Sequence, residues 1–243
     1  MTITSRVTKI GVLFLGVLVL GATSWGQNPP IAEQIANAYG LDSWGQVEAI
    51  RYTWNAQFPG VKISHSWVWE PKTGQITYEG KDKEGKLVKV TYQSAQLSSQ
   101  PANVKDEIEP SFINDQYWTF FPFHLVWDSS AIVTDDGMRK LPLGHGSARR
   151  VVVKYPAEAG GYTPGDAWDL YVGKDNRVEQ FVYYRGGPKK PRVVIATWAG
   201  YKKAGPILIS TEHRGTADGK PLRVFISDMA VKLTGSDTWM KAE

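Results

Sequence analysis

The chain has 243 residues, of which 42% are hydrophobic and 21% are charged, a composition typical of a folded protein and not of a disordered one. Its formal charge of +4 is too small and too evenly spread for a nucleic-acid-binding protein. The sequence contains no cysteine, which excludes disulfides, thiolate metal sites and cysteine nucleophiles. Aromatic residues are abundant, with ten tryptophans, eleven tyrosines and eight phenylalanines.

Residues 1–26 have the pattern of a secretory signal peptide. Two basic residues precede an apolar run of about 13 residues at positions 10–22, and small side chains follow it. We therefore expect cleavage between Gly26 and Gln27 and a periplasmic or secreted protein. The run is shorter than the roughly 20 residues that cross a bilayer, but an uncleaved membrane anchor stays open as the alternative. We expect residues 27–243 to form a single domain.

The apolar pattern after the leader begins with a helix and then changes to strands. Ile31, Ile35 and Tyr39 lie on one helical face, and Gly40 is a typical helix stop. From Glu48 the apolar residues alternate with polar ones, which predicts roughly ten strands joined mostly by short polar turns. The predicted strands are 50–58, 61–69, 75–80, 86–93, 148–155, 167–172, 177–185, 192–198, 207–214 and 222–233.

An aromatic segment interrupts this series between residues 112 and 127. Ile113, Tyr117 and Phe120 have helical spacing, and Pro122 is expected to end the helix. Residues 97–109 before it are polar and predict a loop. The fold class is therefore mainly β (α+β): a large antiparallel sheet with an N-terminal helix and an aromatic helical insertion.

Several predicted strands are apolar on both faces. Val193 and Ile195 oppose Val194 and Ala196, whereas a sheet with one solvated face should alternate cleanly. Either something covers both faces of the sheet, or the sheet curls around a cavity.

Three segments carry a resemblance to a known fold family. They are Phe112 to Trp118, Phe121 to Asp128 and Gly160 to Tyr171. With the leader, the N-terminal helix and the long sheet, the chain resembles the bacterial outer-membrane lipoprotein-carrier fold, and more closely an uncharacterised family of secreted bacterial proteins with that architecture. The resemblance covers nearly all of residues 31–233. It implies a curved half-barrel with helices in its mouth and brings no established activity.

The aromatic residues are the candidate ligand-binding site. A helix of flat, rigid side chains over a curved sheet suits acyl chains or rings, although a plain core helix packed on the sheet would show the same pattern. We expect His65 to orient a ligand head group as the polar member; the alternative is a histidine bonded to a neighbouring carbonyl. The expected apolar wall consists of Trp67, Trp69, Tyr117, Trp118, Phe121, Trp127 and Trp168.

These residues predict an exported protein that binds or carries a hydrophobic or amphipathic, lipid-like ligand. We expect a monomer without metal or cofactor that contacts a membrane or an acceptor protein transiently and binds no nucleic acid. Two alternatives stay open. One is an envelope enzyme that pairs His65 or His213 with a carboxylate such as Asp228 or Glu212. The other is a structural protein whose core is filled.

Overall fold

The computed structural model describes residues 30–243 except 83, 159–161 and 188–191. The predicted signal peptide, residues 1–26, lies outside the described residues. None of the helices within the described residues has the length and apolar composition needed to cross a membrane.

The described chain forms one antiparallel sheet of 13 strands, hydrogen-bonded in the order β4-β3-β2-β1-β12-β11-β9-β8-β7-β6-β5. Two further strands lie off this path, because β10 pairs with β11 and β13 pairs with β12. The first group of strands is β1 (Val47–Phe58), β2 (Val61–Glu70), β3 (Gln75–Lys81) and β4 (Leu87–Gln93). The second is β5 (Ile132–Lys140), β6 (Ser147–Lys154), β7 (Ala167–Val172), β8 (Val178–Tyr184), β9 (Val193–Thr197), β10 (Ala199–Ala204), β11 (Ile207–Ala217), β12 (Lys220–Leu233) and β13 (Trp239–Lys241).

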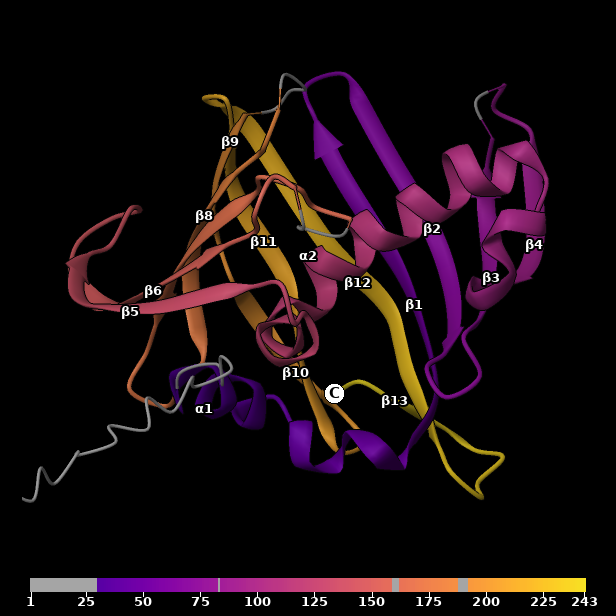
Figure 1. The fold of residues 1–243 in the computed structure, drawn as a ribbon, viewed down its shortest axis with the longest axis horizontal. Coiled ribbons are helices and arrows are strands. Elements are labelled where there is room, and N and C mark those ends of the chain that lie inside the picture. The colour runs from indigo at the N-terminus through magenta and orange to yellow at the C-terminus, as the bar shows by residue number, and fades with distance from the viewer. Residues whose placement is uncertain (1–29, 83, 159–161, 188–191) are drawn as a thin grey trace, which may run out of the picture.

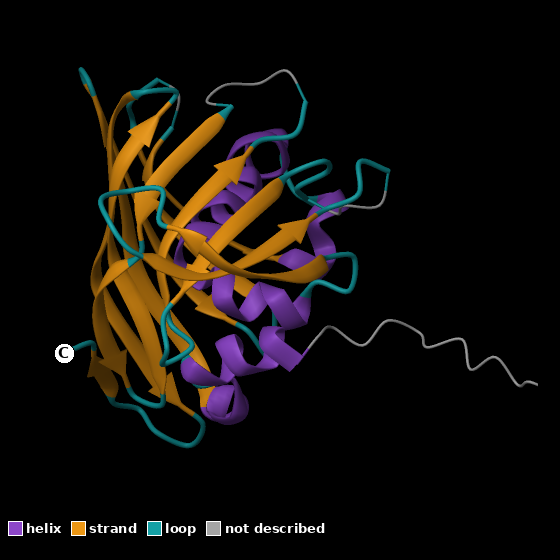
Figure 2. Cartoon of the chain, turned by 90° about the vertical axis from the view of Figure 1, so that its left-hand side faces the viewer, coloured by secondary structure: helices purple, strands orange, loops and turns teal. Residues whose placement is uncertain are grey.

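The sheet curves around a long helix. Figure 1 shows α2 (Glu109–Trp127) crossing the hollow side, with β1 to β4 on one flank and β5 to β9 on the other. Helix α1 (Pro30–Ala38) lies across one end of the hollow, and in Figure 2 the helices all lie on the same face of the sheet. Shorter helical turns are η1 (Leu41–Gln46), η2 (Ser94–Ser99) and η3 (Val104–Ile108). The predicted fold class, a large curved antiparallel sheet with an N-terminal helix and a helical insertion, is confirmed.

The structure adds three strands to the ten predicted ones. β5 contains Asp135-Asp136-Gly137, a sequence typical of a turn, but here it forms a bulged edge strand paired with β6. β10 and β13 are short strands, and each forms an antiparallel pair with its neighbour in sequence, β10 with β11 and β13 with β12. The predicted loop at 97–109 also differs, because it overlaps the end of η2, contains η3 and ends on the first residue of α2.

The prediction that Pro122 ends the aromatic helix is wrong. The helix bends at Phe120, whose backbone angles are φ −119° and ψ 16°, and continues to Trp127. Proline has no N–H, so it leaves the carbonyl four residues earlier, that of Trp118, without its helical donor. Nε2 of His213 on β11 lies in this place, 3.1 Å from the Trp118 oxygen, and donates to it in the tautomer that carries its proton on Nε2. A donor from the sheet thus allows the helix to pass the proline.

The two apolar faces of the strands have different neighbours. The inner face packs against α1 and α2 in one large core that includes Val194 and Ala196 of β9. The outer face carries a small second cluster of Ala148, Tyr171 and Val182, against which Val193 and Ile195 pack. The sheet thus curls around its own helices, which cover the inner face, and Leu141 packs on the small cluster of the outer face.

Gly215 provides a sensitive test of the strand packing in this curved sheet. A Cβ atom at Gly215 would lie 1.8 Å from the Ile195 carbonyl oxygen, a backbone atom that cannot move aside. We expect Gly215→Ala to lower the free energy of unfolding by about 3 kcal/mol in urea denaturation. Gly45→Ala is the matched control, because nothing lies within 4 Å of the added atom, and it should change stability by less than about 0.5 kcal/mol. Equal stabilities of the two variants would contradict this account.

Candidate functional site

The space beneath the middle of α2 is filled by aromatic side chains of the protein itself. Phe120, Phe121 and Phe123 are fully buried. Phe121 stacks on Trp168 of β7, with ring centroids 4.1 Å apart and planes at 26°. Two clefts lie on either side of the N-terminal half of α2.

The first opening, the tryptophan cleft, lies between α2 and the ends of β7 and β8. It has a volume of about 600 Å³. Trp118 and Trp168 line it together with Tyr117, Ile113 and Tyr183. The indole Nε1 of Trp168 is buried and has no hydrogen-bond partner among the described residues. The cleft thus combines aromatic walls with an unused hydrogen-bond donor.

The acidic side chains of the tryptophan cleft have partners within the protein, and Arg185 interacts with Asp166 and Tyr183. Glu109 accepts hydrogen bonds from Tyr92 and Tyr162, and burial raises its pKa above the usual value despite them. Asp166 accepts from the Tyr183 hydroxyl at 2.9 Å and from a backbone N–H, and burial raises its pKa as well. Both carboxyls are therefore engaged within the protein.

Two basic side chains, Lys105 and Arg185, also line this cleft. Lys105 is exposed and Arg185 is half-buried, whereas the two acidic side chains are buried. The positive charges thus lie closer to solvent than the carboxyls do. An entering ligand would meet a basic rim above an aromatic wall.

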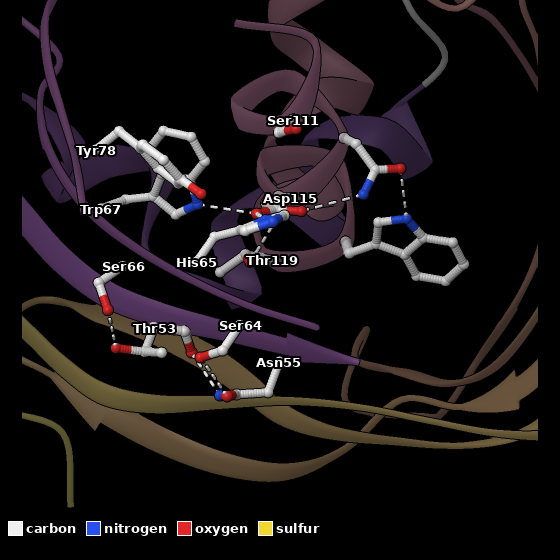
Figure 3. Close-up of polar contacts among 12 residues, drawn as sticks. Thr53, Asn55, Ser64, His65, Ser66, Trp67, Tyr78, Ser111, Asp115 and Thr119 are labelled. Carbon is white, nitrogen blue, oxygen red and sulfur yellow. Dashed lines mark hydrogen bonds and ion pairs between the residues drawn. The ribbon is translucent and has the colours of Figure 1, made fainter. Parts of the chain in front are cut away.

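The second opening, the histidine cleft, has a volume of about 490 Å³ and lies between α2, η3 and strands β1 to β4. His65 lines it, and its Nδ1 is 2.7 Å from Oδ2 of Asp115 on α2 (Figure 3). Asp115 is fully buried, and its Oδ2 also accepts from the Trp67 indole N–H at 2.9 Å. Burial raises the pKa of Asp115, while the hydrogen bonds from His65 and Trp67 act in the opposite direction.

The remaining predicted wall residues lie elsewhere. Trp67 is buried beside Asp115, and Phe121 belongs to the core. Trp69 and Trp127 are half-buried next to Trp44 of η1, with Trp44 and Trp127 centroids 4.7 Å apart. The structure thus brings Tyr117, Trp118 and Trp168 together in one cleft and places His65 in the other. Trp69 and Trp127 instead lie beside η1, at the opposite end of α2.

The histidine–carboxylate pairs considered from sequence do not form. His213 is fully buried with Nδ1 toward the Thr197 carbonyl, and burial lowers its pKa to about 4. Glu212 instead binds Arg223 with two hydrogen bonds. Asp228 is exposed and accepts from the Ser227 hydroxyl. His65 does pair with a carboxylate, but the partner is Asp115.

A second histidine–carboxylate pair stabilises the end of α2. His124 Nδ1 lies 3.0 Å from Asp128 Oδ1, and the Tyr117 and Tyr155 hydroxyls donate to Oδ2. Burial acts to raise the pKa of Asp128, but these three donors outweigh it, and the pKa is lower than usual. This network joins the helix to the residue that follows β6, and it leaves the buried Nε2 of His124 without a hydrogen-bond partner among the described residues.

Sequence reasoning missed Asp115, Trp54 and Arg185. Asp115 lies in the aromatic segment and is the only acidic residue between Glu109 and Asp128, a signal that could have marked it. No local pattern links it to His65, which is 50 positions away. Trp54 precedes the β1–β2 turn, and the antiparallel register of that hairpin places it opposite His65.

No family model and no curated protein matches the sequence. Solved structures that resemble it include a DUF1329 family protein from Desulfovibrio piger, with a TM-score of 0.47, 10% identity and coverage of 86% of this chain and 93% of that one. A second, named as an outer-membrane lipoprotein-sorting protein domain from Vibrio parahaemolyticus, has a TM-score of 0.46, 11% identity and the same coverage. The lipoprotein LppX from Mycobacterium tuberculosis has a TM-score of 0.32, 8% identity, and coverage of 84% and 96%. The chain is thus similar to proteins of the two kinds that its sequence resembles, an uncharacterised family and the lipoprotein-carrier fold.

Proposed function

We propose that this protein binds an amphipathic ligand with an apolar chain and an anionic head group in the tryptophan cleft, and that it acts in the cell envelope. The observation that carries the proposal is the cleft itself, in which the aromatic walls lie below a basic rim. Its volume of about 600 Å³ is within the usual range of small-molecule sites. The predicted signal peptide supports the location.

The chemistry of the cleft favours this ligand class. Burying a chain of about 14 methylene groups contributes on the order of 10 kcal/mol before the costs of binding, so few polar contacts are needed. The Trp168 and Trp118 rings give the apolar part of the ligand flat aromatic walls. Lys105 and Arg185 line the same cleft and would attract a carboxylate or a phosphate. A ligand held in this way exchanges by partition, with no covalent step.

The test starts from the purified protein. Organic extraction followed by mass spectrometry should recover an anionic amphiphile, and dansyl-labelled undecanoic acid should bind with a rise in fluorescence. Arg185→Gln should weaken that binding about tenfold, which corresponds to about 1.4 kcal/mol, and leave binding of the neutral amide of the same probe nearly unchanged. Arg149→Gln is the matched control, because Arg149 pairs with Asp135 and does not line the cleft.

Two results would contradict the proposal. A protein that carries no extractable amphiphile and binds neither probe would exclude ligand binding in this cleft. Equal affinities of wild type and Arg185→Gln for the acid would exclude the head-group assignment.

A further inference from the structure

The histidine cleft holds a polar arrangement that ligand binding in the tryptophan cleft does not use. Its central pair, His65 and Asp115, joins strand β2 to helix α2 across the core. His65 is the exposed member, with 18% of its side chain accessible, while Asp115 is fully buried. A buried carboxylate behind an accessible imidazole is the order found in general-base pairs.

The contacts of Asp115 determine which nitrogen of His65 is free. Oδ2 accepts from Trp67 at 2.9 Å and faces His65 Nδ1, and Oδ1 accepts from Asn114 at 3.1 Å. A carboxylate can only accept, so Nδ1 carries the imidazole proton. Nε2 then holds the lone pair and has no hydrogen-bond partner among the described residues. This is the protonation pattern that a general base needs.

Aromatic rings hold the imidazole in this orientation. Trp54 stacks on His65 with centroids 5.8 Å apart and planes at 14°. Tyr78 and Trp67 contact the ring at larger interplanar angles. The indole Nε1 of Trp54 is buried without a partner among the described residues, and Trp54 lines the same cleft. The stacked Trp54 ring thus fixes the plane of the imidazole.

The charge around the opening restricts the substrate. Asp82, Asp106 and Glu107 line the cleft. Apart from His65, its described lining residues include one basic side chain, Lys81. The excess of negative charge disfavours anionic substrates. The walls are otherwise aromatic and aliphatic, with Tyr78, Ile63 and Val88. A neutral or cationic molecule with an apolar part therefore fits the histidine cleft best.

We propose that His65 and Asp115 form a general-base pair that hydrolyses a neutral or cationic carboxylic ester in the histidine cleft. His65 is the catalytic residue and Asp115 is a positioning residue. His65 Nε2 accepts a proton from water while the water oxygen bonds to the ester carbonyl carbon, whose π electrons move to the carbonyl oxygen. When the tetrahedral intermediate collapses, the bond to the alcohol oxygen breaks and Nε2 returns the proton to it. Water and ester thus give acid and alcohol, and His65 ends neutral.

The experiment compares hydrolysis of p-nitrophenyl butyrate, of the cationic butyrylcholine and of an anionic p-nitrophenyl succinate. We expect the wild-type protein to turn over the first two and to discriminate against the third. His65→Gln should lower kcat/KM at least about 100-fold, the usual contribution of a general base. His145→Gln is the matched control, because His145 is exposed outside the cleft and should leave the rate unchanged.

Asp115→Asn tests the positioning role with a readout beyond the rate. An asparagine accepts from Nδ1 only through its uncharged carbonyl oxygen, so kcat should fall while KM stays similar. Near-UV circular dichroism of each variant shows whether the fold is kept.

Equal rates in wild type and His65→Gln, or no turnover by the wild-type protein of either preferred ester, would overturn the proposal. His65 lines the histidine cleft and not the tryptophan cleft, so His65→Gln should still bind dansyl-undecanoic acid. Failure of the hydrolysis proposal can therefore be distinguished from failure of the ligand-binding proposal.

Discussion

Replacing Asp115 with alanine should lower the free energy of unfolding by about 4 kcal/mol, one of the two largest effects expected in this protein. The carboxylate is fully buried and is the acceptor for both His65 Nδ1 and the Trp67 indole N–H. Its removal leaves these donors without a partner in the core and separates α2 from β2, and each buried donor that loses its acceptor costs about 1–3 kcal/mol.

Urea denaturation at neutral pH measures this loss. Asp106→Ala is the matched control, because Asp106 is an exposed carboxylate at the rim of the same cleft and should change stability by less than about 0.5 kcal/mol. A loss below about 1 kcal/mol for Asp115→Ala would show that the donors find other acceptors and that the buried pair does not hold the helix on the sheet.

The second large effect is a loss of stability in mild acid that depends on His213. Burial lowers the pKa of His213 to about 4, from 6.5 for an exposed histidine. Above pH 6.5 the ring is neutral in both the folded and the unfolded state, so its contribution is fully present. As the pH falls toward 4, the unfolded chain takes up a proton that the folded protein resists, and the free energy of unfolding decreases by about 3 kcal/mol.

The measurement is the free energy of unfolding at pH 7.5 and pH 4.5 for wild type and His213→Leu. The variant should be about 2 kcal/mol less stable at pH 7.5, because the Trp118 carbonyl loses its donor beside Pro122. Its stability should then fall less than that of the wild type on acidification, so that the two curves approach each other. Parallel curves would mean that other groups produce the acid sensitivity.

The β1–β4 meander shows how much of the fold could be predicted. The alternation of Ile50 to Phe58 and of Val61 to Trp69, with a Pro-Gly turn between them, indicates a hairpin, and the structure pairs Trp54 with His65 in that hairpin. Alternation is a local property, since every second side chain of a strand faces the same side. The strand interpretation therefore needed no knowledge of distant residues.

The helix α2 shows where local rules fail. Pro122 is a helix breaker when its missing hydrogen bond has no replacement, yet His213, 95 positions from Trp118, supplies one. The same holds in β5, where Asp135-Asp136-Gly137 reads as a turn but pairs with β6 through a bulge, with Arg149 and Arg150 binding the two carboxylates. In both places a partner distant in sequence overrides the local preference.

The amino-acid sequence by itself determined the mainly antiparallel sheet and the aromatic helix, and it predicts the signal peptide. These follow from periodicity, composition and turn residues, which act over a few neighbouring positions. The tertiary structure alone decided that Phe120, Phe121 and Phe123 fill the hollow, that open space remains on both sides of α2, and that His65 meets Asp115. The reason is that packing between the helix and the curved sheet depends on how side-chain volumes fit together across the two layers. The spacing of residues along the chain does not encode that fit.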